Sequence, residues 1–466
     1  MLAASLVVTA SAQACGSYYG EIGLEKLAEL AVSGNSSEAS RAITVLRARE
    51  TAGLAAFLAV HGEEIQRHTA TIPTFPLAQT NQPIDGRWDR LSKALDTISG
   101  QRDCAASHLY WHTDLEKAKA AARASGKPIL SLRLLGRLDE ELSCANSRFF
   151  RTALYANAEV SRLLREHFVL HWQSVRPVPK ITIDFGDGRK LERTITGNSI
   201  HYMLDADGRP IDAWPGLYGP KAFLRGLRRA EAATKHFAAL APEEREDFLR
   251  TYHQERLAAI KAEWNNDLIK VGHTSATTSP TSATSSLPAA TQSVNNPPAA
   301  QAAAVITRGK RRVELPVLQA MAPGNPGELE AKMDDVAWAK LAALHSEDAR
   351  LDQGSRTLMA KKHPDALAAG KRALSKMVVE DPLVRAVRQF ERSMAEDTVR
   401  NEYLFHTQIH EWFAAALPQA RDITVLNEKV YTELFLTPKS DPWLGLKPND
   451  AYSALDHDGV VTQARQ

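Results

Sequence analysis

The stretch Ile129-Leu130-Ser131-Leu132-Arg133-Leu134 decides the fold, because its nearly continuous apolar run is typical of a strand buried on both faces. Before it, Thr113-Asp114-Leu115-Glu116 is a capping box that predicts the start of an alanine-rich helix, which Gly126-Lys127-Pro128 ends. After it, helical patterns lead to a second apolar strand, Phe168-Val169-Leu170-His171-Trp172. Helix and strand therefore alternate over residues 108–238, which predicts an α/β domain.

Two turn signals extend this pattern toward the C-terminus. Gly186-Asp187-Gly188 separates two β-prone runs and predicts one hairpin, and Asp205-Ala206-Asp207-Gly208 predicts a second. A helical pattern then begins near Pro220 and continues to about residue 268. We divide it into the closing helix of the α/β domain and a helical extension over residues 239–270.

Both flanks of the α/β domain are predicted to be mainly α-helical. Residues 21–105 and 325–466 carry apolar side chains at helical spacing, with prolines and glycines between the runs. The segment 271–312 differs, because residues 271–307 contain no Asp, Glu, Lys or Arg and are mostly Ser, Thr, Ala, Pro and Asn. Such a composition cannot bury enough apolar surface to offset its chain entropy, so we expect a disordered linker there.

The first fourteen residues have the features of a secretory signal peptide. Residues 1–14 are uncharged, with an apolar core followed by small residues that suit a cleavage site. The alternative is a buried N-terminal helix. We expect an exported protein, periplasmic or of the cell envelope, and cleavage after Ala14 would make Cys15 the first residue and a candidate lipid anchor. If Cys15 carries a lipid, Cys104 and Cys144 are left as a possible disulfide pair; if it does not, at least one of the three thiols stays free in an oxidising compartment.

Composition and charge exclude several classes of function. The 466 residues include 57 Lys and Arg against 55 Asp and Glu, so the net charge of +2 provides no strong field for nucleic acid. The hydrophobic share of 44% is that of a globular protein. No apolar run reaches the ~20 residues of a membrane-spanning helix, and no glycine-rich phosphate loop stands between a strand and a helix. We therefore expect no nucleic-acid partner, no transmembrane segment and no cofactor.

The order of elements between about residues 108 and 235 resembles the thioredoxin-like fold. The resemblance rests on Leu115-Glu116-Lys117-Ala118 with the first strand, on Cys144 at a strand-to-helix turn, and on the second hairpin with Pro215-Gly216 and a closing helix. It covers under a third of the chain, which also resembles exported bacterial proteins. The resemblance implies an α/β thioredoxin-like central domain flanked by mainly α-helical N- and C-terminal regions.

The resemblance places a candidate redox site at Cys144, Ser147 and Ser199. In the family two cysteines separated by two residues begin a helix, whereas Cys144-Ala145-Asn146-Ser147 keeps only the first of them. The family's cis-proline position, counted back from Asp205, is Ser199 here. A thiol at a helix N-terminus is stabilised as the thiolate, but without a resolving thiol its mixed disulfide persists.

Two functions are compatible with this degenerate site. The first is an exported thioredoxin-like protein with monothiol or mixed-disulfide chemistry, which as an enzyme would be a thiol-disulfide oxidoreductase-like protein. The alternative is a non-catalytic binding or scaffold protein of the cell envelope that uses the thioredoxin-like domain to bind a protein partner. The two differ in whether the Cys144 thiol is exposed and has a lowered pKa. The alternative interpretation of Cys144 is a small buried apolar residue at the start of the helix.

A third pattern lies in the C-terminal region, where Glu402, His406 and His410 recur every four residues. In a helix this spacing places all three on one face, and two imidazoles with a carboxylate can bind zinc. The run from His406 to His410 lacks the glutamate of a zinc-protease signature. The alternative is a half-buried polar seam between helices, and we assign no metal ligand on the sequence alone.

Overall fold

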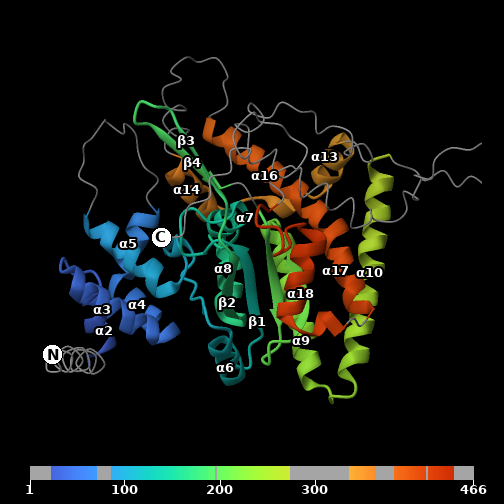
Figure 1. Ribbon diagram of the computed structural model, residues 1–466, viewed down its shortest axis with the longest axis horizontal. Helices are drawn as coiled ribbons and strands as arrows, with labels where there is room; N and C mark the ends of the chain where they lie inside the picture. The colour runs from blue at the N-terminus through green and yellow to red at the C-terminus, as the bar shows by residue number, and fades with distance from the viewer. Residues whose placement is uncertain are drawn as a thin grey trace, which may run out of the picture.

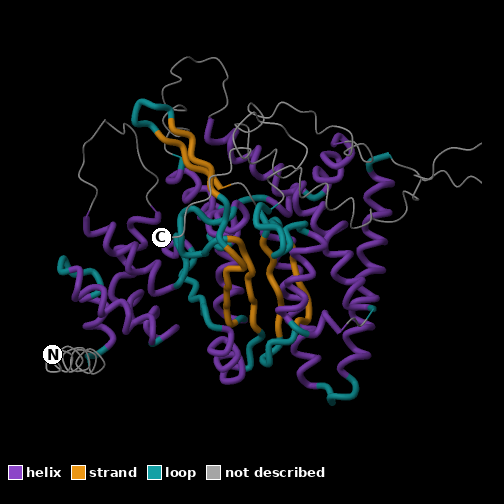
Figure 2. The backbone as a smooth tube through the Cα atoms, viewed as in Figure 1, coloured by secondary structure: helices purple, strands orange, loops and turns teal. Residues whose placement is uncertain are grey.

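The computed structural model describes residues 22–70, 86–194, 197–272, 335–363, 382–415 and 418–444. Within them the chain is mostly helical, with a small mixed sheet in the middle (Figures 1 and 2). The predicted combination of an α/β centre with helical flanks is confirmed at this level. No described helix is long and apolar enough to cross a membrane. The predicted signal peptide (residues 1–14), Cys15 and residues 273–312 of the predicted linker lie outside the described residues.

The central sheet has the strand order β2-β1-β5-β6. Strands β1 (Ile129–Leu135) and β2 (Val169–Arg176) are parallel, whereas β5 (Ser199–Leu204) runs antiparallel to β1 and to β6 (Pro210–Pro215). Every residue of β1, β5 and β6 is buried. Burial on both faces explains why the sequence of β1 is an almost unbroken apolar run rather than an alternating one.

Helices and helical turns surround the sheet (Figure 2). Those that precede or connect the strands are α2 (Leu24–Leu30), α3 (Ser36–Ala48), α4 (Glu50–Ala70), α5 (Gly86–Ser99), η1 (Cys104–Ala106), α6 (Leu115–Ser125), α7 (Ala145–Phe149), η2 (Phe150–Leu154) and α8 (Ala158–His167). Those that follow the sheet are α9 (Pro220–Ala239), α10 (Arg245–Lys270), α13 (Asp335–Leu344), η3 (Ser346–Ala349), α14 (Gln353–Lys362), α16 (Pro382–Arg400), η4 (Asn401–His406), α17 (Thr407–Ala414), η5 (Pro418–Arg421), α18 (Ile423–Lys429) and η6 (Val430–Leu434). The segments η2, η4 and η6 are π-helical turns.

Both faces of the sheet are covered, by helices from different parts of the chain. Because side chains alternate along a strand, the neighbours His201 and Tyr202 of β5 point to opposite faces. The His201 ring packs against Phe150 of η2 and Phe223 of α9. The Tyr202 hydroxyl donates to Asn427 Oδ1 of α18 at 3.3 Å. The crossover and closing helices therefore cover one face, and the C-terminal helices cover the other.

The first predicted hairpin projects from the sheet domain as a separate two-stranded sheet (Figure 1). Strands β3 (Lys180–Asp184) and β4 (Lys190–Thr194) pair in antiparallel register. Gly186 and Gly188 both have positive φ, at 75° and 90°, which is the backbone geometry that glycine adopts without strain. Phe185 at the tip is 55% exposed, so an aromatic side chain stands in solvent at the end of the hairpin.

The N-terminal helices α2 to α5 form a hydrophobic cluster of their own, which includes Cys104 and Tyr110. The start of α3 follows from its sequence, because the Asn35 side chain accepts hydrogen bonds from two backbone N–H groups of the first turn. Arg47 connects this cluster to the sheet domain by donating to the carbonyls of Ile98 (2.9 Å) and Trp111 (2.5 Å). The N-terminal region is therefore packed against the centre through polar as well as apolar contacts.

The C-terminal helices share a single hydrophobic cluster with the central sheet. Trp338 of α13, Met394 of α16, Leu404 of η4 and Leu426 of α18 belong to it, as do the core residues of β1 and β5. Burying these apolar surfaces together stabilises the attachment of the C-terminal region by the hydrophobic effect. The described part of residues 325–466 thus completes the core of the sheet domain.

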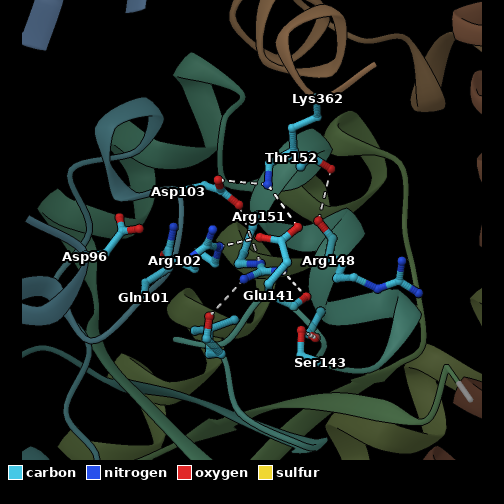
Figure 3. A network of polar contacts seen from close by, with 12 residues as sticks. Asp96, Gln101, Arg102, Asp103, Glu141, Ser143, Arg148, Arg151, Thr152 and Lys362 are labelled. Atoms are coloured by element: carbon cyan, nitrogen blue, oxygen red, sulfur yellow. Dashed lines mark hydrogen bonds and ion pairs between the residues drawn. The ribbon is translucent and has the colours of Figure 1, made fainter. Parts of the chain in front are cut away.

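A network of charged side chains joins three distant parts of the chain (Figure 3). Lys362 of α14 lies 3.0 Å from Asp103 and 3.5 Å from Glu141. The Arg151 guanidinium of η2 lies beneath them, 1% exposed, and donates to the carbonyl of Glu140 at 2.7 Å. The N-terminal region, the crossover and the C-terminal region therefore meet at one polar junction.

Candidate functional site

Cys144 lies directly before α7, at the strand-to-helix turn that the sequence predicts. Its backbone N–H donates to the carbonyl of Leu135 (3.2 Å), which returns the loop to the end of β1. Gly136 opens this loop with φ of 74°, and a Cβ there would stand 2.9 Å from the Val178 side chain. The thiol is completely buried.

Ser147, the second residue of the predicted redox site, lies in the first turn of α7 and is completely buried. Its hydroxyl lies 2.6 Å from Ser143 Oγ and 2.8 Å from the carbonyl oxygen of Cys144. The serine therefore hydrogen-bonds within the turn that holds Cys144. This arrangement positions the turn but supplies no second thiol.

Ser199, the third residue of the predicted redox site, is the first residue of β5 and pairs with Leu134 of β1. It is completely buried, and its Oγ has no hydrogen-bond partner among the described residues. The Asn146 side chain of α7 donates to the carbonyl of Gly197, just before β5. This hydrogen bond brings the Cys144 turn next to the segment that leads into Ser199.

The C-terminal region covers this site. Tyr431 of η6 donates to the carbonyl of Asn198 (3.1 Å), and the Asn198 side chain donates to Thr437 Oγ1 (3.3 Å). Arg176 of β2 holds the same segment by donating to the carbonyl of Thr437 (2.6 Å). Burial, and then the neighbouring Cys144 thiol, raise the pKa of Tyr431 well above its ordinary value. The Cys144 turn thus lies in the interior, beneath residues more than 280 positions further along the chain.

The two described cysteines are buried thiols and form no disulfide with each other. Cys104 belongs to the N-terminal hydrophobic cluster, and its Sγ donates to the carbonyl of Leu109 at 3.6 Å. Burial raises the pKa of the Cys104 thiol to about 12. The possible Cys104–Cys144 disulfide is therefore not formed, and Cys15 lies outside the described residues.

A second cluster of reactive side chains lies at β6, in the interior. Asp212 of β6, His406 of η4 and His410 of α17 each offer one metal-ligand atom, and these atoms lie within 4.8 Å of one another. Asp212 Oδ1 is 3.1 Å from His406 Nε2 and 4.0 Å from His410 Nε2. All three residues are at most 1% exposed. Among the described residues, this is the group of histidines and carboxylates whose ligand atoms lie close enough together to hold one metal ion.

Further side chains hold each member of the cluster in place. Glu402 accepts from His406 Nδ1 at 2.7 Å, so the predicted helical stacking of these two residues is confirmed. Tyr252 of α10 donates to Asp212 Oδ2 (2.7 Å). The neighbouring His253 shares a hydrogen bond between its Nδ1 and His410 Nδ1 (2.8 Å). The cluster is therefore a network with an inner set of three residues and an outer set of partners.

The charges of the network follow from its burial and its neighbours. Burial alone would lower the pKa of His406, but Glu402 and Asp212 outweigh it and raise that pKa to about 9. Burial and the adjacent His406 charge lower the pKa of His410 well below its ordinary value. Burial opposes ionisation of Asp212, but His410 and His406 outweigh it and hold its pKa well below the usual range. The pKa values of the two histidines therefore move in opposite directions, because only His406 lies between two carboxylates.

Sequence reasoning identified only the part of this cluster that lies on one helix. Glu402, His406 and His410 are linked by their spacing, whereas Asp212, Tyr252 and His253 come from β6 and α10. One signal for Asp212 is visible in the sequence, because it is a charged residue inside the apolar strand Ile211-Asp212-Ala213-Trp214. A buried charge is retained only with partners, so such a position indicates a polar network.

Comparisons with known proteins add no family. No protein-family model, no curated protein and no solved structure matches this chain.

Proposed function

We propose that this chain is an exported, non-catalytic binding or scaffold protein whose central domain is thioredoxin-like with a closed, degenerate site. The order of elements supports the fold. A strand, a helical crossover, a parallel strand, two antiparallel strands and a closing helix follow one another, which is the order on which the resemblance rests. The hairpin of β3 and β4 is inserted between the parallel pair and the antiparallel pair.

The burial of the Cys144 turn is the observation that supports a binding or scaffold protein over monothiol chemistry. Thiol-disulfide exchange requires the thiolate to contact a substrate sulfur. Cys144 and Ser199 are both completely buried, and Tyr431 is bonded to the backbone next to Ser199. A substrate strand would have to displace the C-terminal region before it could reach the thiol. Burial of this kind favours a binding protein over monothiol chemistry.

The reactivity of Cys144 tests this choice. Alkylation of the native protein by a small reagent, followed by peptide mapping, measures the Cys144 rate separately from other thiols. We expect Cys144 to react at least ~100-fold more slowly than in the unfolded chain, which corresponds to an opening free energy of at least ~2.7 kcal/mol. A native rate equal to that of the unfolded chain would refute the closed site and support monothiol chemistry.

Two tyrosine variants test which part of the C-terminal region shields the Cys144 thiol. Tyr431→Phe removes the hydrogen bond to the carbonyl of Asn198 and, at ~0.5–1.5 kcal/mol, should accelerate Cys144 alkylation by about 2- to 12-fold. Tyr403→Phe removes a buried hydrogen bond to Asp267 in another part of the C-terminal region and serves as the control. Equal acceleration by both variants would mean that the thiol is reached by global unfolding rather than by lifting of η6.

The projecting hairpin is the element best suited to bind a partner. Because β3 and β4 form a two-stranded sheet, each presents an edge through which another strand can pair by backbone hydrogen bonds. A photo-crosslinking residue at Phe185 in the cell envelope should form a discrete adduct. The control is Val425, an apolar residue of α18 that is 46% exposed. Equal yields at both positions, or none at Phe185, would contradict a hairpin interface.

Export is tested independently of the site. Protein recovered from the cell envelope should lack residues 1–14 by intact mass measurement. A chain that keeps Met1 and remains in the cytoplasm would contradict this part of the proposal.

A further inference from the structure

The distances at β6 are close to those of a metal site. With metal–nitrogen and metal–oxygen bonds of ~2.0–2.1 Å, two ligand atoms of a tetrahedral site stand about 3.3 Å apart. The separations from Asp212 Oδ1 to His406 Nε2 and His410 Nε2 are 3.1 Å and 4.0 Å, on either side of that value. Small rotations of side chains would therefore suffice to place one ion among the three atoms.

An unpartnered nitrogen is the second observation that points to a ligand. His410 Nε2 is completely buried and has no hydrogen-bond partner among the described residues. The nearest oxygen of Asp212 is 4.0 Å away, beyond hydrogen-bond distance. Buried polar groups normally have a partner, and a metal ion between this nitrogen and Asp212 would provide one.

Each of the three side chains is oriented through its other polar atom. Glu402 accepts from His406 Nδ1, and Tyr252 donates to Asp212 Oδ2. The Nδ1 atoms of His253 and His410 share a hydrogen bond. Metal-bound histidines and carboxylates usually have such outer partners, which fix the ring orientation and leave Nε2 for the ion.

From this geometry we propose that Asp212, His406 and His410 bind one divalent transition-metal ion, with Zn²⁺ as the best fit. Two imidazole nitrogens and one carboxylate oxygen suit Zn²⁺, whereas Mg²⁺ and Ca²⁺ prefer oxygen ligands. The site joins β6 to η4 and α17, so the ion connects the sheet to the C-terminal helices. The proposal does not depend on the function of the Cys144 site.

A neighbouring cavity reaches an outer partner of the cluster. It has a volume of about 80 Å³ and is lined by Glu402, Trp214, Tyr218 and Arg256, among others. Glu402 belongs both to this cavity and to the outer partners of the cluster. An ion entering the cavity would therefore meet a carboxylate next to the His406 ring.

Metal titration of the full-length, untagged chain tests the proposal. After treatment with a chelator, the protein should bind one Zn²⁺ per chain, and Co²⁺ should give the intense visible absorption of a four-coordinate site. Glu402→Gln should weaken Zn²⁺ binding by 10–100-fold, and His410→Gln should abolish the Co²⁺ absorption. His61→Gln is the matched control, because His61 is a buried histidine that bonds to the carbonyl of Ala28, away from both the cluster and the cavity.

Several outcomes would overturn the proposal. They are an absence of stoichiometric Zn²⁺ binding, an unchanged affinity in His410→Gln, or a loss of affinity in His61→Gln as large as that in His410→Gln. Circular dichroism checks that each variant is folded. If His410→Gln is unfolded, the decision rests on the wild-type chain, whose thermal midpoint should rise with Zn²⁺ and not with Mg²⁺. Equal shifts with both ions would again overturn the site.

Discussion

Replacing Arg151 should lower the free energy of unfolding more than replacing an exposed charged residue of the polar junction formed with Asp103, Glu141 and Lys362 (Figure 3). The Arg151 guanidinium is 1% exposed and donates to the carbonyls of Glu140 (2.7 Å), Glu141 (3.3 Å) and Leu138 (3.4 Å). Its Nε lies 3.8 Å from a carboxylate oxygen of Asp103. Arg151→Met keeps most of the apolar stem but removes every one of these donors.

The expected loss in the free energy of unfolding depends on the buried carboxylate that loses its partner. Removing one partner of a buried ion pair costs ~3–5 kcal/mol. Lys362 stays 3.0 Å from Asp103, so the carboxylate keeps one cation and the lower end, about 3 kcal/mol, applies. Arg102→Met is the control, because Arg102 is 41% exposed and its pair with Glu141 is worth less than ~1 kcal/mol.

Urea unfolding followed by tryptophan fluorescence measures both variants. Arg151→Met should lower the midpoint without changing the slope, since a changed slope would report a different denatured or native state. A loss below ~1 kcal/mol, or one equal to that of Arg102→Met, would refute the reasoning that burial sets the contribution of this junction.

Two further predictions concern α4 and the end of α13. Gly53→Ala should destabilise the protein, because a Cβ at Gly53 would lie 1.9 Å from the carbonyl oxygen of Leu46. Gly62→Ala should instead stabilise it by ~0.5–1 kcal/mol, because the space around Gly62 is open and alanine favours the helix. Thermal unfolding of the two variants measures both effects. Hydrogen bonding to Asp267, and then to a second aspartate, raises the pKa of His345 to about 9. Protonated His345 therefore stabilises the folded state by about 1–2 kcal/mol after allowing for solvent exposure. This contribution is present below pH 6.5 and is lost as the pH rises through 9. In His345→Gln the free energy of unfolding should depend less on pH over that interval. Equal thermal midpoints for the two alanine variants, or an unchanged pH slope in His345→Gln, would contradict these predictions.

The sheet was predictable because its signals are local. The strand β1 is an apolar run between glycine-containing turns, and Asp114 caps α6 by accepting from two backbone N–H groups. Gly186 and Gly188 mark the hairpin because their positive φ values require residues without a Cβ. Each of these features depends on residues within about ten positions of one another.

The sites were predictable only where their residues share one element. The spacing of Glu402, His406 and His410 places them on one helix face, but spacing cannot say what that face meets. His406 reaches Asp212 across 194 positions, and Tyr431 reaches Asn198 across 233. Such contacts depend on how whole helices pack on the sheet, which no local pattern encodes. For the same reason the sequence indicated a redox turn at Cys144 and could not indicate its cover.

The two sites also share a structural role, which explains why polar residues are kept in this core. Apolar contacts attach the C-terminal helices to the sheet but are not directional. Hydrogen bonds are directional, and they connect each of the last two strands to a different C-terminal turn: Asn198, just before β5, to Tyr431 of η6, and Asp212 of β6 to His406 of η4. A helix that shifted by one turn would keep much of its apolar burial but would leave these buried polar groups unpaired. The polar contacts therefore select one register among several of similar apolar burial.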